Sequence, residues 1–345
     1  MRVMNVLIVT FVAIFMAFTG FKSVSQGSNI KVYSQVEDNI AFIKFLGKSE
    51  KTYDTPAEVN YRFKVFAENI KNVKELNDQY NHRYLSKYKK TPIERAFEIG
   101  GTGDLSKEEL EARYILRYNL GIEAITKDRG DVAGYRYASY GREGYELRVR
   151  DHGSCNACWA FATVASLEKQ YFEDTGKQVD LSPQNLVDCV LENFGCNGGH
   201  VSAAMFYAST HGLMTSSHYP YMATRRYCQY DPSKAVRMTI SPDNSFDFNV
   251  DEASKMTKRG IHPASAVKAD GSFRFLSSSE EVFDASLTDD CNYAVNHAIN
   301  IIDARDGYVT VLNNWGDAWG HRGIKNIRPC SDDVLFGLGA RLIHG

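Results

Sequence analysis

The chain has 345 residues, which is long enough for two or three cooperative units with a sizeable hydrophobic core. Hydrophobic residues make up 43% of it and charged residues 24%, and both values are ordinary for a globular protein. The formal net charge of -2 gives no support to nucleic-acid binding, because such proteins usually carry a basic excess. We therefore expect no nucleic-acid partner.

The first 25 residues have the pattern of a secretory signal peptide. Arg2 precedes an apolar run from Val6 to Phe18, and small residues follow at 23–25. The alternative is an uncleaved signal anchor, because the run with its flanks approaches the length that spans a bilayer. No second run of this kind exists in the sequence. We therefore expect a soluble protein in the secretory pathway that meets a membrane only through an uncleaved anchor.

A long helix is predicted to begin at Thr55. Thr55 is a good capping residue, Pro56 is favoured at the first helical position, and Glu58 completes a capping box. Residues at intervals of three or four form one stripe on this helix: Glu58, Arg62, Phe66, Asn69, Val73 and Asn77. The same region also fits an ordinary amphipathic helix whose apolar face packs inward.

The middle of the chain is expected to be helical and the last third to be rich in strands. Between residues 114 and 150 glycines are frequent and apolar runs are few, which predicts a linker or an extended crossing segment. A helix is predicted to run from Cys158 and to stop at the C-cap residue Gly176. Ser182-Pro183 predicts the start of a second helix. After about residue 238, short alternating stretches such as 308–312 indicate strands.

All seven cysteines follow residue 154, in the part of the chain expected to enter an oxidising compartment. Six can pair, and the odd one is a reactive thiol, a merely buried thiol or a partner in a bond between chains. Cys158 is the candidate nucleophile, because the N–H groups and dipole of a helix N-terminus favour a thiolate. Such a nucleophile needs a histidine base and a third group that orients the ring. His297 and Asn313 are candidates, although with nine histidines chemistry alone does not choose between them.

Motifs then identify the family. They occur in one order along the chain: Cys155-Asn156-Ala157-Cys158-Trp159-Ala160-Phe161, Cys196-Asn197-Gly198-Gly199, Asn296-His297-Ala298 and Asn313-Asn314-Trp315-Gly316. On these motifs the chain resembles a papain-like cysteine protease of the cathepsin L-like branch, in precursor form. The stripe on the first long helix is similar to the ERFNIN motif of that family's inhibitory propeptide, with Val73 in place of the usual isoleucine.

The resemblance implies an α+β, papain-like two-domain fold. A helical left domain would surround a central catalytic helix, a β-barrel-like right domain would follow, and a helical prodomain would precede both. The expected parts are the following: signal peptide or anchor 1–25, inhibitory propeptide 26–130, and peptidase domain 131–345 with a helical half at about 131–240 and a β-rich half at about 241–345.

The resemblance also implies residue roles. Cys158 would act as a thiolate paired with the His297 imidazolium, Asn313 would orient the imidazole, and an acyl-enzyme would form during hydrolysis of a peptide bond. The other cysteines would form three disulfides: Cys155–Cys196, Cys189–Cys228 and Cys291–Cys330. The substrate-binding residues would be Gly198, Gly199, His200, Val201, Val267, Val295 and Trp315. A mainly apolar pocket predicts an aliphatic or aromatic substrate residue two positions before the cut.

The same resemblance implies peptide and protein substrates, with the chain's own propeptide as an intramolecular inhibitor. We expect a monomer without a cofactor, in an acidic lysosome-like or vacuole-like compartment or secreted from the cell. The histidines lack metal-ligand spacing, so no metal site is expected.

One departure from the family concerns His152, six residues before Cys158. The family has a glutamine there, whose amide completes the oxyanion hole. A histidine can donate one N–H, so we assign His152 to the oxyanion hole and expect weakened or pH-altered catalysis. Two alternatives remain at this point. One is a weakened or inactive relative that acts as a binding or regulatory protein, and the other is a dithiol oxidoreductase that uses Cys155-x-x-Cys158.

Overall fold

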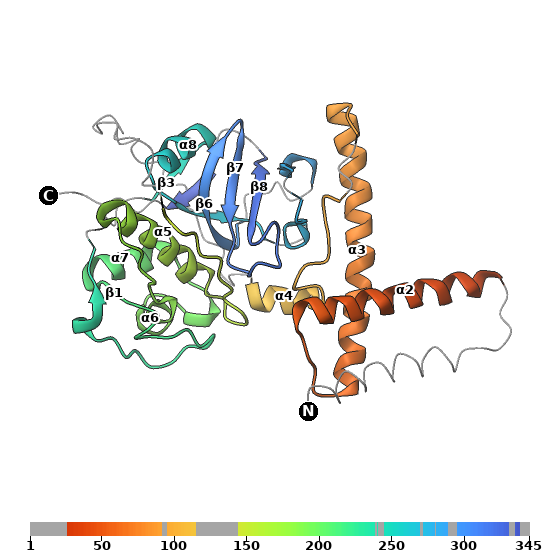
Figure 1. Ribbon diagram of the computed structural model, residues 1–345, viewed down its shortest axis with the longest axis horizontal. Coiled ribbons are helices and arrows are strands. Elements are labelled where there is room, and N and C mark those ends of the chain that lie inside the picture. Colours follow the sequence, from red (N-terminus) through yellow and green to blue (C-terminus); the bar gives the residue numbers. More distant parts are fainter. Residues whose placement is uncertain are drawn as a thin grey trace. The chain divides into compact units, whose positions relative to one another are not determined.

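The computed structural model describes residues 26–91, 95–114, 144–238, 240, 245–269, 272–279, 281–288, 295–330 and 335–338 (Figure 1). The expected signal peptide, the expected boundary at 130–131 and Cys291 lie outside the described residues. In the described part, no helix is long and apolar enough to cross a bilayer. The chain divides into two compact units, residues 1–74 with 101–106 and residues 75–100 with 107–345.

The first unit is built from two helices: α2 (Gln26–Ser49) and the first part of α3 (Pro56–Tyr88). The predicted start of α3 is confirmed, because the backbone N–H of Glu58 donates to Oγ1 of Thr55 at 3.1 Å. Phe66 is 2% exposed, and its ring packs on Phe42 and Phe45 of α2 at centroid distances of 5.2 and 4.9 Å. These aromatic contacts form the core of the unit.

Polar residues of the stripe on α3 form hydrogen bonds with the backbone of residues 103–105, which follow α3 in the chain. Arg62 donates to the backbone carbonyl of Asp104 at 3.2 Å. The buried amide of Asn69 donates to the carbonyls of Gly103 and Leu105 at 2.8 and 3.0 Å. An ordinary amphipathic helix would need no polar side chains on its buried face. These hydrogen bonds show that the stripe also holds together the segments of the expected propeptide.

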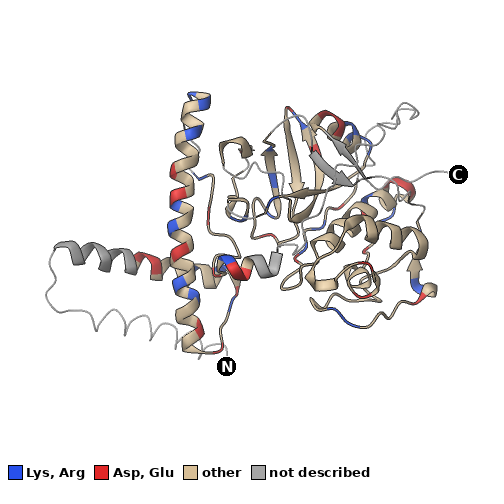
Figure 2. Cartoon of the chain, turned by 180° about the vertical axis from the view of Figure 1, so that it is seen from behind, with Lys and Arg blue, Asp and Glu red and all other residues tan. Residues whose placement is uncertain are grey.

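The end of α3 belongs to the second unit and packs on the β-rich half. Asn77 bonds both backbone groups of Phe97, accepting at 3.0 Å and donating at 2.9 Å. Tyr80 is 1% exposed and stacks on Phe283 with 5.2 Å between ring centroids. Part of the expected propeptide is therefore in direct contact with the expected peptidase. Figure 2 shows that acidic and basic residues alternate in position along α3.

The helical half of the second unit supplies the core around the site. Its described elements, with the preceding α4, are the following: α4 (Lys107–Tyr114), α5 (Cys158–Thr175), α6 (Pro183–Cys189), α7 (Val201–His211), and the short strands β1 (Leu213–Met214) and β2 (Ala235–Val236). The helix predicted after Cys158 is confirmed as α5, and Gly176 ends it with a φ of 69° in the left-handed region. The second predicted helix is confirmed as α6, where Oγ of Ser182 accepts from the N–H of Asn185 at 3.1 Å.

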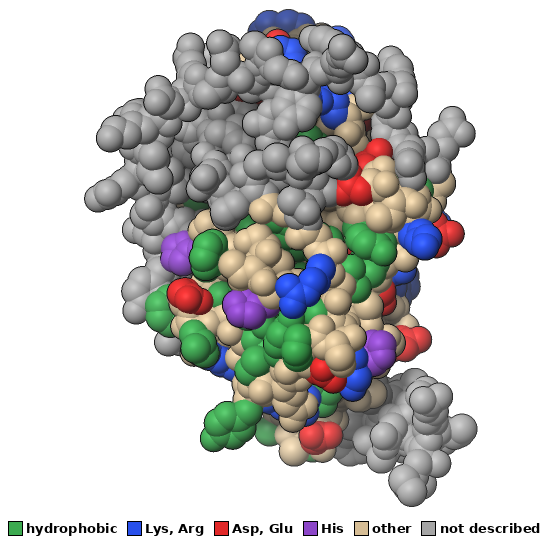
Figure 3. Space-filling model, turned by 90° about the vertical axis from the view of Figure 1, so that its left-hand side faces the viewer, with side chains coloured by type: hydrophobic (Ala, Val, Ile, Leu, Met, Phe, Trp, Pro, Cys, Tyr) green, Lys and Arg blue, Asp and Glu red, His purple; other side chains and the backbone are tan. Residues whose placement is uncertain are grey.

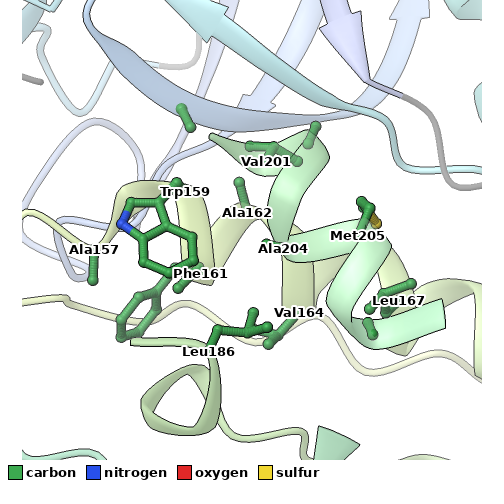
Figure 4. Close-up of a cluster of buried hydrophobic side chains, with 14 of the residues drawn as sticks. Ala157, Trp159, Phe161, Ala162, Val164, Leu167, Leu186, Val201, Ala204 and Met205 are labelled. Atoms are coloured by element: carbon green, nitrogen blue, oxygen red, sulfur yellow. The ribbon is translucent and has the colours of Figure 1, made fainter. Parts of the chain in front are cut away.

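Helix α5 is buried on nearly all sides (Figure 4). Trp159, Val164 and Leu167 have no exposed surface and belong to one apolar cluster with Leu186 of α6 and Met205 of α7. Residues 158–167 of α5 are mostly apolar and nearly all buried, as in a core helix. Packing on every face therefore fixes the position of its N-terminus.

The β-rich half is a sheet whose described strands have the order β3-β9-β4-β6-β7-β8-β5. The strands are β3 (Ser245–Phe248), β4 (Ala264–Val267), β5 (Phe283–Asp284), β6 (His297–Arg305), β7 (Tyr308–Leu312), β8 (Ile324–Arg328) and β9 (Leu335–Leu338). Neighbouring strands are antiparallel except β5 and β8, which are parallel. Short 3-10 helices occur in both halves: η1 (Gly195–Asn197) and η2 (Pro232–Lys234) in the helical half, and η3 (Phe273–Phe275) and η4 (Ala285–Leu287) in the β-rich half. The prediction of strands in this third is confirmed.

The sequence analysis missed one element of the β-rich half, helix α8 (Val250–Lys258). Asn249 and Glu252 form a reciprocal capping box at its start, with N–H to oxygen distances of 2.9 and 3.0 Å. This pattern was present in the sequence and could have identified the helix.

The surface of the helical half is mixed in character. Figure 3 shows the side on which α7 and β1 lie, where hydrophobic, histidine and charged side chains are interspersed. Scattered apolar side chains of this kind are normal for a protein surface.

Candidate active site

Cys158 is the first residue of α5, and Ala157 before it provides no side-chain cap. Cys155 in the same turn is bonded to Cys196, and the N–H of Asn156 donates to the carbonyl of Cys196 at 3.0 Å. Cys158 is a free thiol, so the turn holds no dithiol pair of the oxidoreductase kind. A second disulfide joins Cys189 to Cys228.

Cys330 is also disulfide-bonded, while its expected partner Cys291 lies outside the described residues.

The sulfur of Cys158 lies beside the strand that carries the candidate base. The backbone of Ala298, the residue after His297, hydrogen-bonds this sulfur. Cys158 is 1% exposed, and burial, the largest effect, raises the pKa of its thiol to about 11. Hydrogen bonds from Ala298, Trp159 and its own amide act in the opposite direction and are outweighed. The N–H groups of the helix start therefore reach the sulfur, but the full chain stabilises the neutral thiol.

His297 opens strand β6 and has no exposed surface. Its Nε2 lies 2.8 Å from Oδ1 of Asn313. The same Oδ1 accepts the N–H of Asn314 at 2.8 Å, so this atom is an oxygen and the amide orientation is fixed. An oxygen cannot donate, so Nε2 of His297 carries the proton and Nδ1 keeps the lone pair. Burial lowers the pKa of His297 to about 4, against a smaller opposite effect of the Asn313 bond.

Trp315 connects the two histidines of the site. Its indole ring lies against His297 with 4.6 Å between centroids. Its Nε1–H donates to Nε2 of His152 at 3.2 Å. An indole nitrogen only donates, so Nε2 of His152 is the acceptor and Nδ1 carries the proton of the neutral ring. His152 is fully buried, and its ring centroid lies 6.1 Å from that of His297.

The glycine pair expected at the substrate edge lies between η1 and α7. Gly198 has a φ of 108°, which favours glycine. A Cβ on Gly199 would lie 2.6 Å from Cγ of Asn193, so a larger residue would displace that side chain. Asn193 accepts from the N–H of His200 at 2.8 Å and donates to its carbonyl at 3.0 Å. Sequence reasoning missed Asn193, because a lone asparagine before a glycine pair is no recognisable signal.

The expected pocket valines lie on elements that meet near His297. Val267 of β4 is the register partner of His297, and its carbonyl accepts from the N–H of Asn296 at 3.0 Å. Val295 is 7% exposed and directly precedes Asn296 and His297 in the chain. Val201 belongs to the same buried cluster as Ala298, and His200 is the half-buried N-cap residue of α7.

Across the described residues, no set of three or more His, Cys, Asp or Glu side chains is arranged to hold a metal ion.

Comparisons with known proteins give a consistent result. The family model described as "Papain family cysteine protease" matches residues 141–333, and that of the "Cathepsin propeptide inhibitor domain" matches residues 42–110. Papaya proteinase 4 of Carica papaya is 27% identical over 301 residues, which cover 84% of this chain and 81% of that protein. The senescence-specific cysteine protease SAG12 of Arabidopsis thaliana is 27% identical over 363 residues, covering 99% and 98%. The structure of digestive procathepsin L 3 from Tenebrio molitor larval midgut has a TM-score of 0.68 at 24% identity, covering 87% of this chain and 99% of that chain.

Proposed function

This chain belongs to the papain family of cysteine proteases, and we propose that Cys158, His297 and Asn313 carry out its hydrolysis of peptide bonds. It is a thiol protease made as a zymogen, with a cathepsin-type propeptide inhibitor domain in its N-terminal part. The propeptide acts as an intramolecular inhibitor.

The proposed reaction begins at the sulfur of Cys158. Nδ1 of His297 takes the thiol proton, and the sulfur attacks the carbonyl carbon of the scissile bond. The backbone N–H of Cys158 and Nδ1–H of His152 donate to the oxyanion that forms. The tetrahedral intermediate collapses as His297 returns the proton to the leaving amine, which leaves a thioester on Cys158. A water deprotonated by His297 then hydrolyses the thioester and restores the free enzyme.

The tautomer of His297 is the single observation that carries this assignment. Asn314 fixes the amide of Asn313, and Asn313 in turn requires the proton of His297 to be on Nε2. The ring therefore presents the lone pair of Nδ1, which has no hydrogen-bond partner among the described residues. A base oriented by a third group in this way is the arrangement that nucleophilic catalysis needs.

Substrate recognition is proposed for the residues around the glycine pair. Gly198 and Gly199 allow the substrate backbone to approach closely. His200, Val201, Val267, Val295 and Trp315 line the adjoining surface, which favours an aliphatic or aromatic residue two positions before the cut.

The proposed setting is the secretory pathway, with the protease acting as a monomer in an acidic lysosome-like or vacuole-like compartment or after secretion. Two disulfides in the described part support an oxidising compartment during folding. In this proposal residues 1–25 are the signal peptide, 26–130 the inhibitory propeptide and 131–345 the peptidase domain.

Turnover of a fluorogenic dipeptide tests the assignment. The full-length chain is incubated at acidic pH until the propeptide is cleaved, and hydrolysis is then followed from acidic to neutral pH. Activity is expected for the natural chain and for Ser209→Ala, a surface control on α7, and no activity is expected for Cys158→Ala. Absence of turnover by the natural chain at every pH would instead favour an inactive relative that serves as a binding protein.

A further inference from the structure

Asn300 joins the helix of the nucleophile to the strand of the base. It lies on β6, three residues after His297, and is 2% exposed. Its Nδ2 donates to the backbone carbonyl of Ala162 at 3.0 Å and to Oγ of Ser166 at 2.9 Å, and both acceptors are on α5. Neither contact has a part in the proposed chemistry.

The hydrogen bonds of Asn300 form a directed chain. The two protons of its Nδ2 serve the two acceptors on α5. Oγ of Ser166 accepts from Asn300 and donates its own proton to the carbonyl of His262 at 2.7 Å. His262 lies just before β4, the neighbour of β6 in the sheet. Helix α5, strand β6 and the entry to β4 are thereby tied at one buried point.

Stability alone does not explain a buried amide at this position. The neighbouring residues of β6 are apolar, and Ala298, Ile299 and Ile301 are each at most 2% exposed. An apolar side chain would bury the same surface without the cost of removing an amide from water. A buried polar group whose donors are all used acts mainly on geometry, because it accepts only one arrangement of its partners.

The geometry that it fixes is that of the catalytic pair. Ala162 is one helical turn after Cys158, and Asn300 is three residues after His297. The backbone of Ala298, between His297 and Asn300, contacts the sulfur of Cys158. If α5 slid along β6, the hydrogen bonds of Asn300 would break, and the same movement would displace the sulfur of Cys158 from the imidazole of His297. A misplacement of about 1 Å at a reacting atom can cost about 100-fold in rate.

We propose that Asn300 is a positioning residue that fixes the register of α5 against β6 and thereby sets the position of the sulfur of Cys158 relative to the imidazole of His297. The proposal rests on the proposed catalytic roles of Cys158 and His297. It gives a function to a side chain that none of the recognised motifs contains.

The test compares Asn300→Leu with a matched control, Asn185→Leu. Leucine has the same number and branching of side-chain heavy atoms as asparagine, although it is somewhat larger, and it removes the hydrogen bonds. Asn185 lies on α6 and is also fully buried; it accepts from the N–H of Met214 and donates to Sγ of Cys189. After acid processing of each full-length chain, kcat, KM, Tm and the pH dependence of Cys158 alkylation by iodoacetamide are measured.

For Asn300→Leu we expect kcat to fall at least about 10-fold with KM changed less than about twofold. The acidic limb of the alkylation profile should shift to higher pH, because the imidazolium no longer lies at the thiolate. The control should lose a similar amount of Tm and keep both the kcat and the profile of the natural chain.

The proposal is overturned if Asn300→Leu has the kcat and alkylation profile of the control. Should Asn300→Leu fail to fold, Ser166→Ala removes one arm of the network and should lower kcat about threefold with a smaller shift of the same limb. An unchanged kcat and profile in Ser166→Ala would then overturn it. An inactive natural chain refutes the catalytic assignment itself, which separates the two failures.

Discussion

Alkylation of Cys158 is expected to be slow in the full-length chain and fast after the propeptide is removed. In the full chain Cys158 and His297 are 1% and 0% exposed. Burial raises the pKa of the thiol to about 11 and lowers the pKa of the imidazole to about 4. Between these values the neutral thiol and the neutral imidazole are favoured, so we expect little reactive thiolate in the precursor.

The size of the effect follows from the thiolate fraction. At pH 7 a thiol with a pKa of about 11 is ionised in about one molecule in 10,000. An ordinary cysteine with a pKa of about 8.5 is ionised in about one molecule in 30. The precursor should therefore react roughly 300-fold more slowly than an exposed cysteine, with a rate that rises tenfold for each pH unit up to about pH 11. Removal of the propeptide should expose the pair, so that an imidazolium stabilises the thiolate at acidic pH.

The assay is the second-order rate of iodoacetamide modification from pH 4 to pH 10, with the modified residue identified by mass spectrometry. Cys158→Ala is the control, because the remaining label then reports any other thiol. The precursor should show only the alkaline rise, and the processed enzyme should show a plateau that extends to acidic pH. The reasoning is refuted if the precursor already has that plateau, or if the processed enzyme remains as slow as the precursor.

Three further outcomes are expected. The carboxylate of Glu168 accepts two hydrogen bonds from the guanidinium of the largely buried Arg150, at 2.7 and 2.9 Å. Glu168→Leu removes both and should lower the free energy of unfolding, measured by urea titration, by about 3–5 kcal/mol. A loss below about 1 kcal/mol would contradict this. Burial acts to raise the pKa of Asp284, but hydrogen bonds from neighbouring hydroxyl and ammonium groups outweigh burial and hold the pKa below its usual range. The ion pair between Asp284 and Lys87 of α3 is therefore stabilising at neutral pH, and this stabilisation is lost as the pH falls and Asp284 is protonated. Asp284→Asn should therefore allow processing of the precursor at higher pH on gels, and an unchanged pH dependence would speak against it. His152→Ala should lower kcat about 100-fold or more while His152→Gln retains activity, and equal rates in the two variants would exclude the oxyanion role.

Local signals explain how much of the fold the sequence predicts. The ends of α3, α5 and α6 are set by residues within a few positions of each end, such as Thr55, Gly176 and Ser182, so they can be read from the chain. The same applied to α8, whose capping box was present but not used. The proposed reactive groups could also be named from the sequence, because each lies in a short motif.

Groups that act across the fold could not be found in this way. Asn193 and Asn300 bond partners that are brought to them by packing, and neither belongs to a recognisable pattern. The ionisation of Cys158 follows the same rule. Its motif predicts a stabilised thiolate, and the helix N–H groups do lower the pKa, but burial among residues brought together by the fold raises it by more.

In the proposed oxyanion site, the hydrogen bond from Trp315 would allow His152 to take the place of a glutamine. A primary amide offers one acceptor oxygen and one N–H group, so it could receive the indole proton and still donate to the oxyanion. A neutral imidazole has the same pattern once its tautomer is fixed, with Nε2 of His152 receiving Nε1–H of Trp315 and Nδ1–H left as donor. A protonated ring would instead direct an N–H at the indole N–H and lose this bond. The proposed oxyanion role therefore needs the neutral ring of His152 with its proton on Nδ1, an arrangement that the amide in His152→Gln would reproduce.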